Sequence, residues 1–301
     1  MSPLSRSTAA AHSGKRPSAA IELTSEGVIA AAGRHNPVFA FEPLRPGVLV
    51  PGISELNMSS PEAVSLAIRN ALGAVSPSTR FVTVVIPDTA VRVFVLDFDS
   101  LPGRASEAIP VLRFRLRKMV PFDVEHAGLS YQVLSESKTE ARVLVAVLPS
   151  NVLDEYETVV RGAGYEPGAI IPSALAALAT LDTEEPTLAA CLSKVAITTS
   201  ITRGDDLLLY RTLDLPEDPQ QRLLEVQRSV AVAAAYYEDK VSVLPKELYF
   251  AGNGTAAEFE RWFGTSELRI IDLVSSPSSG VATSMSNMSI AGLTGALAGA
   301  T

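Results

Sequence analysis

The sequence is poor in cysteine and histidine. Cys191 is the only cysteine among 301 residues. A single cysteine excludes an internal disulfide framework and a metal site built from several cysteines. The three histidines, His12, His35 and His126, are far apart in the sequence, and none has a metal-ligand spacing. We therefore predict no metal site. We also predict no catalytic residue, because no aspartate stands at a helix start that would suit a kinase.

Long apolar runs and basic runs are also missing. No apolar stretch reaches the roughly 18–20 residues that cross a bilayer; the best candidates, 170–181 and 290–300, are predicted to be core helices. The formal net charge of -8, without a basic run, argues against a nucleic-acid partner. Residues 1–18 are rich in Ser and Ala and lack the apolar segment of a secretory signal, so we predict a flexible tail. Any contact with a membrane is therefore expected to be made through a partner.

The chain has enough hydrophobic residues to form a large core. Hydrophobic residues make up 47% and the mean hydropathy is +0.23, which is enough for two globular domains. Strands and hairpins lead into helices twice, which predicts an α/β two-domain fold with mixed sheets. We place domain I at 19–182 and domain II at 183–301, with the boundary in the polar stretch 182–186.

The most informative stretch runs from Phe81 to Leu134. It predicts strands over 81–87 and 91–97, a helix over about 107–120 with Pro110 in its first turn, and a strand over 129–134. Elsewhere we predict a hairpin over 19–32, strands over 38–41, 48–50, 142–148, 166–171, 188–192, 195–202, 207–215, 248–250 and 270–273, and helices over 60–75, 151–162, 173–181, 220–237, 256–262 and 290–300.

The order of short motifs resembles the PilM family of actin-like type IV pilus assembly proteins. The motifs in the first half are Ile86-Pro87, Val91-Arg92-Val93, Leu101-Pro102, Val120-Pro121-Phe122 and Leu129-Ser130-Tyr131, and later Gly162-Ala163-Gly164 and Phe250-Ala251-Gly252. The likeness covers most of 19–301 and rests on order and spacing. The cytoplasmic domain of the type II secretion protein GspL shares the architecture. The resemblance implies an actin-like (ribonuclease H-like) two-domain fold with a small α/β subdomain inserted at about 81–151.

Actin-like ATPases hold phosphates with two hairpin turns, in which a carboxylate precedes a glycine by two positions. Here the first turn reads Ile21-Glu22-Leu23-Thr24-Ser25: it keeps Glu22, but Thr24 stands where glycine is expected. The second reads Cys191-Leu192-Ser193-Lys194-Val195 and lacks both the acid and the glycine. The candidate cofactor-binding residues are Glu22, Thr24, Ser25, Ser193, Lys194, Gly252, Asn253 and Gly254. We expect ATP with Mg²⁺ to bind weakly or not at all.

The resemblance implies a cytoplasmic protein that is held at the inner membrane by a partner, with the partner site in the inserted subdomain. In the PilM family this subdomain helps form a groove for the N-terminal peptide of the bitopic membrane protein PilN, and the family anchors a ring under the pilus machine. The candidate partner-binding residues are Val91, Val93 and Val95, on a strand edge open to strand addition, and Arg113 and Arg117, on a basic helix face. That face either holds an acidic segment or is simply solvated.

Two further patterns have ordinary structural explanations. Asp97 and Asp99 are predicted to form a solvated turn, and Ser173 to cap a helix. The sequence therefore favours a scaffold that docks a membrane partner, with self-association into a ring as a further expectation. The alternatives are an active ATPase or phosphotransferase of the actin superfamily and a GspL-like component. The two phosphate turns discriminate between scaffold and enzyme.

Overall fold

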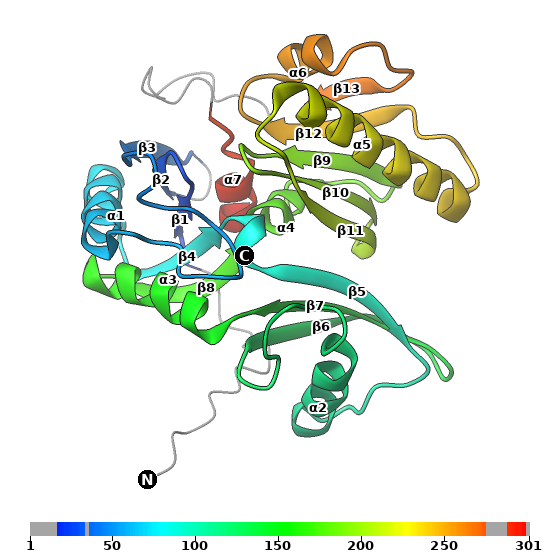
Figure 1. Cartoon of the computed structure of the whole chain (residues 1–301), viewed down its shortest axis with the longest axis horizontal. Helices are drawn as coiled ribbons and strands as arrows, with labels where there is room; N and C mark the ends of the chain where they lie inside the picture. Colours follow the sequence, from blue (N-terminus) through cyan, green and yellow to red (C-terminus); the bar gives the residue numbers. More distant parts are fainter. Residues whose placement is uncertain (1–16, 34–35, 275–287, 299–301) are drawn as a thin grey trace.

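The computed structural model describes residues 17–33, 36–274 and 288–298. Its strands form two five-stranded sheets and one three-stranded sheet. Figure 1 shows the two large sheets in separate parts of the molecule and the small sheet at one end. Most of the predicted tail, together with His12, His35 and the Ser-rich stretch 275–287, lies outside the described residues.

The first sheet has the strand order β3-β2-β1-β4-β8. Its strands are β1 (Ala19–Leu23), β2 (Gly27–Ala32), β3 (Val38–Pro43), β4 (Phe81–Ile86) and β8 (Glu166–Pro172). The predicted hairpin is the antiparallel pair β1 and β2, and β4 runs parallel to both β1 and β8. The short alternation of apolar residues and the turn before Gly27 are local signals, which is why the hairpin is predictable.

The second sheet repeats this topology with the order β11-β10-β9-β12-β13. Its strands are β9 (Thr187–Leu192), β10 (Ala196–Arg203), β11 (Asp206–Asp214), β12 (Glu247–Gly252) and β13 (Arg269–Asp272). Again an antiparallel three-strand meander is followed by two strands that run parallel to its first strand. The long helix α5 (Pro219–Val241) and the short helix α6 (Ala256–Phe263) pack on this sheet through an apolar cluster around Phe250.

The third sheet has the order β5-β7-β6 and carries one helix. Its elements are β5 (Arg92–Phe98), α2 (Ala105–Leu116), β6 (Gly128–Glu136) and β7 (Ala141–Leu148). Because β4 belongs to the first sheet, the inserted sheet begins at Arg92, after the short 3-10 helix η1 (Asp88–Ala90), and not at Phe81.

The predicted helix over 107–120 is shifted. It begins at Ala105 and ends at Leu116, so Pro110 lies inside the helix and not in its first turn. The Pro110 ring is exposed, so the helix tolerates it at the loss of one backbone hydrogen bond. The predicted strand over 48–50 is only a bridge between Leu49 and Met58.

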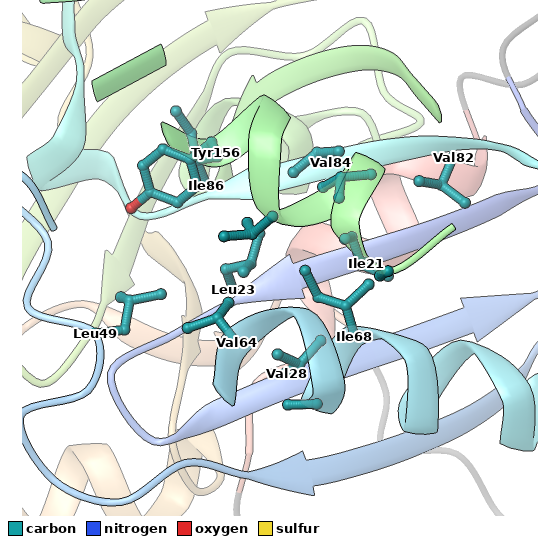
Figure 2. Packing of buried hydrophobic residues seen from close by; sticks show 14 of the residues in the cluster. Ile21, Leu23, Val28, Leu49, Val64, Ile68, Val82, Val84, Ile86 and Tyr156 are labelled. Atoms are coloured by element: carbon teal, nitrogen blue, oxygen red, sulfur yellow. The ribbon is translucent and has the colours of Figure 1, made fainter. Parts of the chain in front are cut away.

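Helices cover both faces of the first sheet. The α1 helix (Pro61–Val75) and the α3 helix (Ser150–Gly162) pack on one face, where Ile21, Leu23 and Val84 belong to the same buried cluster (Figure 2). Within it the Tyr156 hydroxyl donates to Asn57 Oδ1 at 3.0 Å. The alternate residues of β1 point to the other face, so Glu22 faces away from this core.

That other face is covered by α4 (Ser173–Leu178) and α7 (Ala291–Ala298). Ala176, Leu293 and Ala296 share an apolar cluster with Ala20 and Val85. The last helix therefore packs on the first sheet, although the sequence-based division placed 183–301 in domain II. The two helices cross closely, because a Cβ added at Gly295 would lie 1.8 Å from the Ala176 carbonyl oxygen.

We predict that Gly295→Ala lowers the free energy of unfolding by about 2–3 kcal/mol, since the backbone of one helix must move to admit the methyl group. The matched control is Gly73→Ala in α1, where a Cβ meets nothing within 4 Å and helix propensity should add about 0.5–1 kcal/mol of stability. Urea unfolding of both variants checks this; equal effects would contradict the close crossing.

Candidate functional site

A cleft of about 780 Å³, open to solvent, lies between the two large sheets. Its walls come from the β1–β2 turn, the β9–β10 turn, the turn after β12 and the start of α7. Six of the eight predicted cofactor residues line it: Glu22, Thr24, Ser25, Ser193, Lys194 and Asn253. The flanking Gly252 and Gly254 are not part of the lining.

The first turn is capped by its own threonine. Thr24 Oγ1 accepts hydrogen bonds from the backbone N–H groups of Glu26 (3.2 Å) and Gly27 (3.1 Å), and it donates to the Gly27 carbonyl (3.0 Å). A glycine at this position would free the Glu26 amide and leave the Gly27 N–H only its 3.3 Å hydrogen bond to the carbonyl of residue 24. The threonine hydroxyl therefore takes the place that an external anion would occupy on them.

The second turn repeats the arrangement with serine. Ser193 Oγ accepts from the backbone N–H groups of Val195 (3.3 Å) and Ala196 (3.0 Å). On its outer side, Arg222 of α5 donates to the carbonyl of Ser193 (3.1 Å) and also to that of Lys194. The Lys194 residue is exposed. Both turns thus use two of their amides internally.

Glu22 lies on β1, and its side chain faces the start of α7. The residue is only 6% exposed. Ser173 Oγ donates to Glu22 Oε1 at 2.5 Å, while Oε2 has no hydrogen-bond partner in the described part of the chain. A Cβ added at Gly292 would lie 2.9 Å from Oε2. Burial raises the pKa of Glu22 to about 7, helped by the charge of Asp88 and opposed by the Ser173 hydrogen bond.

Ser173 does not cap its helix. The N-cap position of α4 is Pro172, and the hydroxyl of Ser173 binds Glu22 across 151 residues of sequence. The expectation of a simple helix cap was wrong because no local pattern reveals so distant a partner.

Asp88 is a site residue that sequence reasoning missed. Its carboxylate accepts from the Ala174 backbone N–H at 3.2 Å and from the Tyr210 hydroxyl at 2.7 Å. Tyr210 lies on β11, so this bond joins the first half of the molecule to the second. Burial raises the pKa of Asp88 to about 6 and holds the pKa of the Cys191 thiol well above its usual range. The position of Asp88 directly after a buried parallel strand was the available signal.

A second hydrogen bond joins the two sides of the cleft. Asn253 Nδ2 donates to Glu26 Oε2 at 3.0 Å, and the Ser289 N–H donates to Asn253 Oδ1 at 3.4 Å. The turn after β12 therefore meets the first hairpin turn directly. The site combines two buried acids with hydroxyl-capped turns and a bridge between its walls.

The three valines predicted to bind a partner contact other parts of the chain. Val91 precedes β5 and is buried in the first core, at 3% exposure. Val93 and Val95 pack against Leu207 and Tyr210 of β11. The three valine side chains therefore hold β5 in place, and what β5 offers on its outer side is its backbone edge.

The two predicted arginines also have internal partners. Arg113 Nη2 donates to the Ala127 carbonyl at 3.1 Å, and Arg117 Nε donates to Glu125 Oε1 at 3.0 Å. Both lie on the flank of α2 that faces the turn over 123–127. The Arg117 pair is exposed, so its guanidinium stays accessible at the surface.

Ion pairs tie the third sheet to the second half. Arg92 lies 3.6 Å from Asp214, and Arg142 pairs with Asp97 at 3.0 Å and with Asp206 at 3.6 Å. Asp97 thus lies on β5 and not in a turn, and its exposed carboxylate pairs with Arg142.

The described residues contain no cluster of three or more His, Cys, Asp or Glu that could hold a metal ion. His126 contacts Asp123 at 2.8 Å. Among the helices that the structure describes, none has the length and apolarity needed to span a bilayer.

The duplicated five-stranded sheets, the cleft between them and the inserted three-stranded sheet define an actin-like fold. A chain of the solved "PilM-PilN type IV pilus biogenesis complex" is similar with a TM-score of 0.74 and 17% identity, over 95% of this chain and 99% of that one. This likeness confirms the expected resemblance at the level of the fold.

More distant structures include the cytoplasmic domain of EpsL from the Vibrio cholerae type II secretion system, with a TM-score of 0.46 and 14% identity over 77% of this chain and 81% of that one. A protein with an actin-like ATPase fold from Bacteroides thetaiotaomicron has a TM-score of 0.45 and 14% identity, over 81% and 85%. No family model and no curated protein matches the sequence.

The two raised pKa values predict a pH dependence of stability. Because Glu22 and Asp88 hold protons more tightly when folded, the folded state binds more protons between about pH 4 and 7. The free energy of unfolding should therefore fall as pH rises through this window, by about 3 kcal/mol for Glu22.

Glu22→Gln should reduce this fall between about pH 4.5 and 7, because it removes the titrating group. Glu260→Gln, at an exposed carboxylate on α6, should leave the fall unchanged. Urea unfolding at several pH values checks both. A Glu22→Gln variant whose stability falls as steeply as that of the wild type would contradict the assignment.

Proposed function

We propose that this protein is a scaffold beneath the inner membrane that docks the short cytoplasmic peptide of a bitopic membrane partner, as part of a type IV pilus or related secretion machine. The observation that carries the proposal is the likeness in fold to a chain of the PilM–PilN complex, which extends over 95% of the chain and so includes the inserted sheet. Association with PilN is a property of that complex, and here it is the basis of a proposal.

The hydrogen bonds and residue types in the cleft favour a scaffold over an enzyme. In both phosphate turns a hydroxyl engages amides that an anion would need, and the second turn has Cys191 where a carboxylate would orient Mg²⁺. Glu22, the acid that remains, is buried and bound to Ser173. These features disfavour the alternative of an active ATPase or phosphotransferase.

The third sheet is the proposed place of docking. Its outer strand β5 has no backbone partner on its free side among the described residues, and a peptide can pair with such an edge. Because Val93 and Val95 face β11, main-chain hydrogen bonds would supply the affinity. Arg117, on the exposed flank of α2, would attract an acidic residue of the peptide. A GspL-like role predicts the same surface with a type II secretion partner.

The nucleotide prediction is that Mg-ATP binds the wild type no more tightly than about 1 mM. The variant Thr24→Gly/Ser193→Gly, which frees the capped amides, should bind it more tightly. Isothermal titration calorimetry measures both. Micromolar binding by the wild type would contradict the proposed loss of the nucleotide site.

The docking prediction concerns the N-terminal peptide of the bitopic membrane protein from the same organism. Fluorescence anisotropy should show saturable binding to the full chain, and Arg117→Glu should weaken it about tenfold, since a surface attraction becomes a repulsion. Arg261→Glu on α6, at the far side of the second sheet, is the control and should have no effect.

Absence of binding to the wild type would refute the docking function. Equal binding by wild type and Arg117→Glu would remove α2 from the site and leave only the strand edge, which Arg92→Pro at the start of β5 would then test.

A further inference from the structure

The outer face of α2 carries an apolar patch that no described element covers. Phe114 is 74% exposed, the most exposed of the large apolar side chains in the described part of the chain. Val111 on the same helix and Met119 in the turn after it are 37% and 40% exposed. The residues that hold the helix to its sheet, Ala108, Leu112 and Leu116, lie on the opposite side and are buried.

The patch lies within the most basic part of the molecule. Residues 104–119 contain five basic side chains and one acidic one, although the whole chain has a formal net charge of -8. Arg115 lies four residues after Val111 on the same side of the helix, and Lys118 lies in the turn that directly follows α2. Neither has an ion-pair partner in the described part of the chain. Arg113 and Arg117 lie on the other flank, toward 123–127.

We propose that this face of α2, defined by Val111, Phe114, Arg115 and Lys118, docks on an anionic lipid surface. An exposed aromatic ring beside unpaired cations is the combination that binds at the boundary between headgroups and acyl chains. The cations draw the helix to anionic headgroups, and the phenyl ring enters the boundary region.

The size and position of the face favour a lipid surface over a protein partner. A helix of 12 residues is about 18 Å long and offers an area of about 200 Å², far below the roughly 800 Å² that each side of a stable protein interface buries. Figure 1 shows α2 at the outer end of the molecule, on the side of the third sheet away from the two large sheets. A flat membrane can reach a helix in this position.

Lipid docking goes beyond peptide docking and does not depend on it. The face would contribute weak affinity alone, since a few cations and one aromatic ring give marginal binding. Held near a membrane by any partner, the same contact would orient the molecule.

The experiment is co-sedimentation of the full chain with vesicles. We expect binding to phosphatidylcholine vesicles that contain about one third phosphatidylglycerol, no binding to pure phosphatidylcholine, and loss of binding at high salt. Phe114→Ser and the double variant Arg115→Glu/Lys118→Glu should each lower the bound fraction at least about fivefold. Because all three side chains are exposed, the variants should fold, which circular dichroism verifies.

Leu244→Ser is the matched control: Leu244 is 64% exposed after α5, so loss of a comparable apolar side chain there should leave vesicle binding unchanged. A second readout is Phe114→Trp in a Trp262→Phe background, whose emission should shift to the blue on anionic vesicles. Failure of the wild type to bind, or equal loss in the control, would overturn the proposal. So would a dimer in sedimentation velocity that Phe114→Ser abolishes, because the occupant would then be a second copy.

Discussion

One buried carboxylate, that of Asp88, joins the two halves of this molecule. It follows the interior strand β4 of the first sheet, accepts the N–H of Ala174 at the start of α4, and accepts the hydroxyl of Tyr210 from the second sheet. The ring of Tyr210 also packs in the apolar cluster that contains Val93 and Val95 of the inserted sheet. The second sheet and the inserted sheet are therefore both positioned by contacts that meet at this one acid. Loss of such a buried, charge-assisted hydrogen bond is expensive because it leaves both partners unsatisfied.

The two sides of the cleft around this acid are joined by contacts within the chain. In an actin-like site, bare glycine turns leave amides for a phosphate, and the ligand supplies contacts that hold the two halves together. Here Thr24 and Ser193 occupy equivalent places in the repeated topology and satisfy their own turns. The contacts across the cleft come from the chain itself, through Asp88 with Tyr210 and Asn253 with Glu26. Each is worth about 1 kcal/mol or somewhat more, and neither requires a bound ligand.

Much of the fold was predictable because its signals are local. Alternating apolar residues and short turns place the hairpins, and apolar spacing places the helices, each within a few residues; the order of motifs then predicts the actin-like architecture. Apart from the shifted start of α2 and the missing strand over 48–50, the failures are non-local. Ser173 and Glu22 are 151 positions apart and Asp88 and Tyr210 are 122, so no sequence window contains either pair. The return of α7 to the first sheet depends on Gly295 fitting against Ala176. The side chains of Val91, Val93 and Val95, predicted to bind a partner, pack against other parts of the chain. The alternation of residues along a strand does not show whether one face meets solvent or a second domain.

The inserted sheet is fixed at both ends of β5, and this bears on how the molecule works. Val91 is held in the first core, while Val93 and Val95 pack on β11 and Arg142 joins Asp97 to Asp206 across the same boundary. A change in the angle between the halves would have to break these contacts or bend β5. In a protein that cycles with ATP, such contacts would oppose each opening. In a scaffold they are useful, because a fixed β5 and α2 present a partner with one preorganised surface and so reduce the entropy cost of binding. The hydroxyl-capped turns and the contacts along β5 therefore act in the same direction: both hold the two halves of the molecule and the inserted sheet in one arrangement without a bound ligand.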